Sequence, residues 1–188
     1  MPTPQPRSHR AIYTGSFDPP TLGHVDIIER GRVLFDDLII AIGRNLSKRE
    51  LFSLDDRRQL MEQLVADIVR RNPSGGRVRV QTYEGLTVDF AKQVDAPFIL
   101  RGIRNISDLT YECQLAMTNR QVADLETVFI MTSQAYSYTS SSLIKQIAAL
   151  GGDLDRLKPI VPPGVIRALK QLKKRTALAH LIDDDGDW

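Results

Sequence analysis

Cysteine is almost absent from this sequence, which has one, Cys113, among its 188 residues. One cysteine cannot form a disulfide within the chain, and no Cys/His pair has zinc-site spacing, so we expect a reducing compartment and no structural metal. Long apolar runs are also missing. The longest lies around residues 38–42, far short of the roughly 20 residues of a membrane helix, so no membrane span is predicted.

Net charge is small as well. The chain has 25 Lys and Arg against 23 Asp and Glu, a net charge of +2, which argues against a nucleic-acid-binding surface and requires any anion site to be local. The first residues are rich in proline and lack an apolar segment, so they predict an extension and not a signal peptide, in a cytoplasmic protein. We expect a disordered extension at 1–9, one domain at 10–176 and an acidic tail at 177–188.

Short β-branched segments alternate with segments of helical periodicity. The candidate strands are residues 11–14, 38–42, 78–83, 98–100 and 128–131. The clearest helix follows Ser53 and has Met61, Leu64, Val65 and Ile68 on one face; a weaker stripe contains Leu109, Cys113 and Ala116. The pattern predicts an α/β, Rossmann-like, doubly wound five-stranded parallel sheet with a C-terminal helical appendage.

The first chemical motif runs from the first strand into a helix, as Thr14-Gly15-Ser16-Phe17-Asp18-Pro19-Pro20-Thr21-Leu22-Gly23-His24. Open α/β sheets bind ligands at the carboxyl ends of their strands. Gly15 would allow a tight turn, and His24 would lie in a first helical turn whose free N–H groups attract phosphate. The alternative for a lone histidine is an incidental residue after a turn, but the full string is typical of the nucleotidyltransferase superfamily.

Two further motifs follow later strands. Arg101-Gly102-Ile103-Arg104 is expected where the fourth strand ends, with guanidinium groups suited to phosphate; the alternative is two surface arginines paired with Asp108 and Glu112. The hydroxyl-rich segment at 136–142 enters a helix after the fifth strand, where one serine would be its N-cap. Because all three motifs leave strand carboxyl ends, we expect them to line one crevice.

On these residues the chain resembles the bacterial phosphopantetheine adenylyltransferases. The matching motifs include Thr21-Leu22-Gly23-His24, Ser47-Lys48, Gly85-Leu86 and Arg101-Gly102-Ile103-Arg104. The resemblance implies that 4′-phosphopantetheine attacks the α-phosphate of ATP in line, giving dephospho-coenzyme A and pyrophosphate without a covalent enzyme intermediate. Mg²⁺ would accompany the triphosphate without a dedicated carboxylate cage and without metal-binding residues on the chain. A homohexamer and inhibition by coenzyme A are also implied.

The resemblance also implies roles for individual residues. The catalytic residues would be His24, Lys48 and Arg101. ATP would be bound by Ser16, Phe17, His24, Gly102, Ile103, Arg104, Glu112, Tyr136, Ser137, Tyr138, Thr139, Ser140, Ser141 and Ser142. The acceptor would be bound by Ser16, Lys48, Thr87 and Arg101, with Thr87 standing where the family commonly has an aliphatic residue. The alternatives are another adenylyl- or cytidylyltransferase of the superfamily and a noncatalytic nucleotide sensor.

Overall fold

Five parallel strands form one sheet in the order β3-β2-β1-β4-β5. The computed structural model describes residues 9–44 and 49–174. The strands are β1 (Arg10–Gly15), β2 (Asp37–Ile42), β3 (Arg77–Thr82), β4 (Phe98–Ile103) and β5 (Glu126–Met131). Ile12 of β1 is paired with Ile39 of β2 on one side and with Ile99 of β4 on the other. The predicted number and direction of strands are therefore confirmed.

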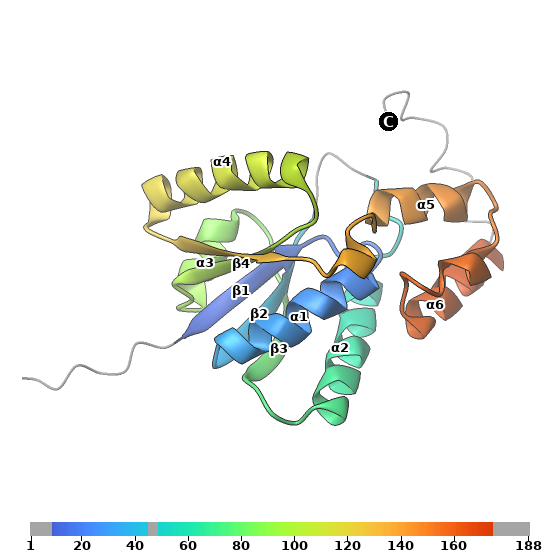
Figure 1. The fold of residues 1–188 in the computed structure, drawn as a ribbon, viewed down its shortest axis with the longest axis horizontal. Coiled ribbons are helices and arrows are strands. Elements are labelled where there is room, and N and C mark those ends of the chain that lie inside the picture. The colour runs from blue at the N-terminus through green and yellow to red at the C-terminus, as the bar shows by residue number, and fades with distance from the viewer. Residues whose placement is uncertain (1–8, 45–48, 175–188) are drawn as a thin grey trace, which may run out of the picture.

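Helices connect and cover the strands. They are α1 (Leu22–Leu34), α2 (Leu54–Arg71), α3 (Thr87–Gln93), α4 (Ile106–Ala123), α5 (Ser141–Ala149) and α6 (Pro163–Lys174), with short 3₁₀ helices η1 (Gln134–Tyr136) and η2 (Leu154–Leu157). Figure 1 shows α1 and α2 on one side of the sheet, α3 and α4 on the other, and α5 and α6 beyond its carboxyl end. In the described part of the chain, no helix has both the length and the apolar character needed to cross a bilayer.

Alternation of side chains along the strands divides the core between the two faces. Leu38 and Ile40 of β2 point toward α1 and α2, where they join a buried cluster that includes Ile28 and Met61. Ile39, between them, points the other way and packs in the cluster that holds residues of α3. Burial on both faces explains why β2 is a continuous apolar run, and it confirms the doubly wound arrangement.

One predicted apolar face is not buried in the core. On α4, the stripe of Leu109, Cys113 and Ala116 was expected to pack inward, but the only buried residue of this helix is Glu112. Ile106 is 83% exposed and Met117 is 65% exposed. The helix thus directs a carboxylate toward the sheet and leaves apolar side chains on its outer surface.

The C-terminal appendage has its own apolar cluster. Ile144 of α5, Leu157 of η2 and Leu169 of α6 pack together with Leu51 and Phe52. On α6, two of the basic residues bind the preceding segment: Lys170 Nζ lies 2.6 Å from Asp155 Oδ2, and Lys173 Nζ donates to the Gly151 carbonyl at 2.8 Å. The predictions for residues 1–8 and 177–188 lie outside the described residues.

Strand order also determines where a ligand can enter. From β1 the chain proceeds to β2 and β3 on one side, and then returns to β4 and β5 on the other. The loops after β1 and β4 therefore diverge between two neighbouring strands. In open α/β sheets this point of reversal is where ligands bind, at the carboxyl ends of the strands.

Candidate active site

A cavity of about 830 Å³ lies at this reversal point. It is lined by the β1–α1 loop, the end of β4, α4, the segment before α5, and the ends of β2 and β3. From the predicted site it contains Ser16, Phe17, His24, Thr87, Arg101, Gly102, Arg104, Glu112, Tyr136, Thr139, Ser140, Ser141 and Ser142. The three motifs, more than 100 residues apart at their extremes, therefore meet in one cavity, as the strand ends predicted.

Three aromatic rings support the β1–α1 loop. Phe17 has a positive φ of 48°, a left-handed conformation that is unusual for a bulky side chain. Its ring is buried edge-on against Tyr13 at 5.3 Å and against His24 at 5.0 Å between ring centroids. The prediction assigned the tight turn to Gly15, but Gly15 is the last residue of β1 and the left-handed residue is Phe17.

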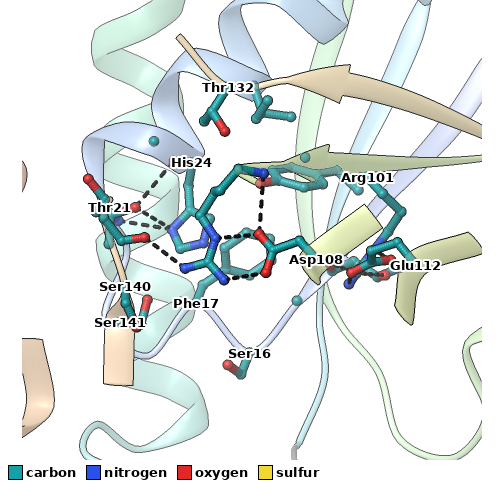
Figure 2. A pocket seen from close by; sticks show the side chains of 18 of the residues that line it. Ser16, Phe17, Thr21, His24, Arg101, Asp108, Glu112, Thr132, Ser140 and Ser141 are labelled. Carbon is teal, nitrogen blue, oxygen red and sulfur yellow. Dashed lines mark hydrogen bonds and ion pairs between the residues drawn. The ribbon is translucent and has the colours of Figure 1, made fainter. Parts of the chain in front are cut away.

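His24 is the third residue of α1 and completes its N-terminal cap. Thr21 N–H donates to His24 Nδ1 at 3.0 Å, while His24 N–H donates to Thr21 Oγ1 at 3.3 Å. Figure 2 shows the two side chains beside each other at the start of the helix. Because Nδ1 accepts this hydrogen bond, the proton of the neutral ring is on Nε2, which is therefore a donor.

Burial lowers the pKa of His24 to about 4, and the charges of Arg104 and Arg101 contribute in the same direction. The ring is thus neutral at pH 7. The prediction attributed phosphate attraction to free N–H groups of this helix, but Leu22 N–H donates to the Ile160 carbonyl at 2.9 Å and His24 N–H to Thr21. The imidazole, rather than these two amides, is the donor that α1 offers.

Asp18 connects the same loop to the rest of the site. Its buried carboxylate accepts from Leu51 N–H at 2.8 Å and Phe52 N–H at 2.9 Å, and it lies 2.7 Å from Lys145 Nζ of α5. Ser141 Oγ donates to the carbonyl of Pro19 at 2.9 Å. The β1–α1 loop and the start of α5 are therefore held together by an ion pair and a hydrogen bond.

A fully buried arginine lies beneath the loop. Arg57 of α2 donates from Nη1 to the carbonyls of Ser16 at 2.9 Å and Gly43 at 3.2 Å, and from Nη2 to Glu50 Oε1 at 2.6 Å. Its Nε is buried without a hydrogen-bond partner. The guanidinium thus ties the backbone after β1 to the backbone after β2, and so fixes the position of Ser16.

Arg101 and Glu112 form an ion pair in the wall of the cavity. Arg101 Nε donates to Glu112 Oε2 at 2.7 Å, Nη2 donates to Oε1, and Nη1 donates to the Thr14 carbonyl at 2.6 Å. Figure 2 shows the two side chains facing each other. Burial alone would lower the pKa of Arg101, but the hydrogen bond and charge of Glu112 raise it overall. The guanidinium is charged at every accessible pH.

Arg104 is paired in the same way, with Asp108. Its Nε and Nη2 reach the two carboxylate oxygens at 2.7 and 3.0 Å, and Nη1 donates to the Thr139 carbonyl at 2.8 Å. The alternative of arginines paired with Asp108 and Glu112 is therefore correct for the pairing, although both arginines also line the cavity. Through Thr139, Arg104 links the end of β4 to the segment before α5.

The strand boundary predicted for this motif was too early. Arg101, Gly102 and Ile103 are the last three residues of β4 and not the loop after it. Ile103 is 1% exposed and does not line the cavity. Gly102 does line it, and a side chain there would place Cβ 2.9 Å from Ile27 Cγ1 of α1. Close packing of α1 on β4 therefore requires this glycine, independently of any nucleotide.

The hydroxyl-rich segment is brought in only partly. Tyr136 and residues 139–142 line the cavity, and Ser140 is the N-cap of α5, with Leu143 N–H donating to its Oγ at 3.4 Å. Ser137 and Tyr138 are not among the lining residues, because the turn after η1 directs Tyr138 outward, where it is 66% exposed. Thr139 Oγ1 is buried and has no partner.

The remaining wall is formed by the ends of β2 and β3. Arg44, Tyr83 and Thr87 line it together with Ser16. Lys48 lies outside the described residues. Within the two described ranges, no group of three or more His, Cys, Asp or Glu side chains is arranged to hold a metal ion.

Sequence reasoning missed several of these residues. Tyr13, Arg44 and Tyr83 line the cavity, and Arg57 supports it from below. One signal was available for Arg57: it is four residues before Met61 and therefore on the apolar face of α2, where a charged residue is unexpected. No comparable pattern marked Tyr83.

Comparisons with known proteins agree with this geometry. The family model described as cytidylyltransferase-like matches residues 12–147. A phosphopantetheine adenylyltransferase from Geobacter metallireducens is 47% identical over 161 residues, 85% of this chain and 93% of the relative. One from Flavobacterium johnsoniae is 47% identical over 80% of this chain and 94% of the relative. The structure of Plasmodium falciparum nicotinic acid mononucleotide adenylyltransferase complexed with NaAD has a TM-score of 0.62 at 16% identity, covering 87% of this chain and 95% of that one, which shows a shared fold.

Proposed function

Since this chain belongs to the phosphopantetheine adenylyltransferases of the cytidylyltransferase-like family, we propose that it transfers the adenylyl group of ATP to 4′-phosphopantetheine. The products are dephospho-coenzyme A and pyrophosphate, and the reaction is a step of coenzyme A synthesis. The observation that carries this proposal is the meeting of a neutral, donor-bearing His24 with two arginines and a hydroxyl-lined helix start in one cavity.

The reaction is a single displacement at the α-phosphorus. An oxygen of the acceptor phosphate forms a bond to this phosphorus while the bond to the bridging oxygen of pyrophosphate breaks, so the electron pair leaves with pyrophosphate. A phosphate dianion needs no base to attack. Catalysis by the protein then consists of positioning the two substrates and stabilising the charge that develops between them.

His24 supplies a hydrogen bond from Nε2 to a non-bridging oxygen of the α-phosphate. The donor is neutral because burial lowers the pKa of His24 to about 4, and its ring is held by Thr21 and Phe17. A donor that is already oriented costs no reorganisation as charge builds up on the phosphate. His24 therefore acts more strongly on the transition state than on bound ATP.

ATP lies on the side of β4, β5 and α5. Arg104 and the N-terminus of α5, where Ser141 and Ser142 line the cavity, face the triphosphate and attract negative charge. Gly102, Tyr136 and Thr139 contribute the walls around the nucleotide. Phe17 acts from below by supporting His24, since its ring is buried.

The acceptor lies on the side of β2 and β3. Ser16 and Arg101 bind its phosphate, with Lys48 as a second cation, and Thr87 lies beside the arm that follows. This arrangement places nucleophile and leaving group on opposite sides of the α-phosphorus, as in-line attack requires. Arg101 exchanges part of its pairing with Glu112 for the phosphate when the acceptor binds.

Mg²⁺ fits the site as a companion of the triphosphate. The carboxylates of the cavity, Asp108 and Glu112, are each engaged by an arginine. Phosphate oxygens and water would therefore be the ligands of the ion, in keeping with the coordination that Mg²⁺ prefers. The chemistry that it supplies when bound is neutralisation of charge on the leaving pyrophosphate.

Self-association, inhibition by coenzyme A and a cytoplasmic location form part of the same proposal. Exposed apolar side chains on α4, including Ile106 at 83% and Met117 at 65%, support contact between copies of the chain. A homohexamer predicts six chain masses in sedimentation equilibrium. Inhibition by coenzyme A predicts competition with 4′-phosphopantetheine, because the two molecules share the pantetheine arm.

The experiment that tests the activity is pyrophosphate release from ATP with each acceptor offered separately. We expect rapid release with 4′-phosphopantetheine and little with nicotinamide mononucleotide or a simple phosphorylated alcohol. Nicotinamide mononucleotide as the better acceptor would assign the chain to a different adenylyl transfer. Tight ATP binding without release of pyrophosphate for any acceptor would identify a sensor.

A further inference from the structure

Two hydroxyl groups meet in the wall of the cavity on its acceptor side. Tyr83 follows β3, and Thr87 is the first residue of α3. Tyr83 Oη and Thr87 Oγ1 are 2.8 Å apart, a hydrogen bond between two side chains that both line the cavity. Thr87 stands where an aliphatic residue was expected, so a polar pair replaces an apolar surface.

The ring of Tyr83 is held firmly. It stacks on Phe90 of α3 with ring centroids 4.8 Å apart and an angle of 21° between the planes. On its other side is Gly43, where an added Cβ would lie 2.8 Å from Tyr83 Cζ and 2.9 Å from its hydroxyl oxygen. The space for this ring therefore depends on the glycine at the end of β2, and the hydroxyl has a fixed place in the cavity wall.

The pair has unused hydrogen-bonding capacity. Each hydroxyl is one donor and an acceptor of two hydrogen bonds. One of the two protons is used between Tyr83 and Thr87, so the pair still offers one donor and several acceptor positions to a bound molecule. A secondary amide, with one N–H and one C=O, matches these groups; a hydrocarbon chain would leave them without partners.

The position of the pair relates it to the acceptor. Ser16 and Arg101 lie in the same cavity, between the hydroxyl pair and the start of α5. Tyr83 is close enough to Arg101 to contribute to the raised pKa of that guanidinium, after burial and Glu112. A molecule whose phosphate is held at Arg101 would extend its next atoms toward Tyr83 and Thr87, away from the pyrophosphate.

Resting on the proposed function, we infer that Tyr83 and Thr87 form a polar subsite that hydrogen-bonds an amide of the pantetheine arm. The pair thereby selects acceptors that carry an amide behind the phosphate. The selection works because a phosphate without the amide leaves two partly buried hydroxyls without ligand partners, and unmet hydrogen bonds discriminate more strongly than apolar contacts do.

The test uses Tyr83→Phe, Thr87→Val and the double variant of the full chain, with 4′-phosphopantetheine as the acceptor. Each change removes one hydroxyl and keeps the shape of the side chain. We expect the acceptor's kcat/KM to fall about 3- to 10-fold for each single variant, in keeping with the loss of one hydrogen bond between neutral groups. The change should appear in the KM of the acceptor, while the KM of ATP stays within about twofold. The double variant should lose less than the product of the two single losses, since the hydroxyls share one network.

Neopentyl glycol monophosphate is the second substrate. It keeps the branched carbon next to the phosphate ester but has no amide, so the wild-type protein and all three variants should use it at equally low rates. Thr118→Val, on the exposed side of α4, is the matched control and should change neither substrate. Thr87→Ser keeps the hydroxyl and should retain the wild-type preference, and thermal unfolding of every variant checks that it is folded.

The outcomes separate this inference from the function on which it rests. A wild-type protein that releases no pyrophosphate with 4′-phosphopantetheine would overturn the proposed function and the subsite together. Normal turnover that both hydroxyl deletions leave unchanged would overturn the subsite alone. Equal losses with both acceptors, or a Thr87→Ser variant as impaired as Thr87→Val, would show that the pair supports the cavity and does not recognise an amide.

Discussion

Thr21 N–H donates to His24 Nδ1 across 3.0 Å, so the N-cap of α1 decides which nitrogen of the imidazole carries the proton. With Nδ1 occupied as an acceptor, Nε2 is the donor of the neutral ring. A histidine that completes a helix cap thus gains a fixed orientation and tautomer from local backbone geometry. The role proposed for His24 follows from this relationship and leads to the first two predictions.

His24→Ala should lower turnover far more than it weakens ATP binding. The lost hydrogen bond strengthens as charge develops on the α-phosphate, and removal of one such donor costs on the order of 10²–10³ in rate. Steady-state kinetics and calorimetric titration of ATP measure the two effects. His9→Ala, at an exposed position before β1, is the control and should behave as wild type. Near-normal turnover of His24→Ala would leave this residue with a structural role only.

The ionisation of His24 should be shifted to low pH. Burial lowers its pKa from 6.5 to about 4, so its NMR resonances should titrate near pH 4, with His24→Gln used for assignment. Between these values the unfolded chain binds more protons than the folded one, so the free energy of unfolding should fall as pH is lowered from 6.5 toward 4. This part of the pH dependence should be absent in His24→Gln. Titration near 6.5 would contradict a neutral ring set by burial.

Arg101→Ala should weaken the use of 4′-phosphopantetheine severely, through a higher KM for this acceptor, while the affinity for ATP changes little. Truncating one partner of a partly buried charge pair typically costs about 2–5 kcal/mol, and part of that cost arises because Glu112 is left unpaired. Arg101→Lys restores the charge but not the two-pronged geometry and should recover only part of the loss. Lys48→Ala should resemble Arg101→Ala. Arg120→Ala, half-exposed on α4, is the control.

Calorimetric titration distinguishes the two substrates directly. An affinity for ATP that collapses in Arg101→Ala or Lys48→Ala, with acceptor binding intact, would place that residue on the triphosphate. The proposed division of the cavity into an ATP side and an acceptor side would then be reversed for that residue.

Arg57→Met should destabilise the fold by about 3–5 kcal/mol, because it leaves Glu50 and the carbonyls of Ser16 and Gly43 without their buried partner. Urea unfolding measures the loss. Arg58→Met is a matched control on the same helix: its ion pairs with Asp55 and Glu62 are exposed, so its cost should stay below about 1 kcal/mol. Equal effects of the two changes would contradict a supporting role for Arg57.

Removal of divalent cations should stop turnover without unfolding the protein. If Mg²⁺ is held by the triphosphate and water, EDTA should abolish pyrophosphate release, and added Mg²⁺ should restore it. The thermal midpoint of the protein without ATP should not change, since ligand binding stabilises only what binds the ligand. A lower midpoint in EDTA would indicate a metal site on the chain itself.

Local sequence patterns were sufficient for the architecture and for the location of the site. The apolar run of β2 and the stripe of Met61, Val65 and Ile68 report burial directly, because side-chain periodicity follows from strand and helix geometry. Position at a strand end predicted that the segments of His24, Arg101 and Ser140 would meet, since parallel strands end at one edge of a sheet. The resemblance to a family added the substrates.

Pairing and orientation of side chains were decided only by the tertiary structure. The sequence does not reveal that Phe17 turns its ring under His24, that Tyr138 faces solvent while Thr139 is buried, or that Tyr83 crosses Gly43 to meet Thr87. Each of these depends on contacts between elements far apart in the chain, which have no period in the sequence. Sequence therefore determined which segments form the site, and packing between those segments determined which of their atoms face a ligand.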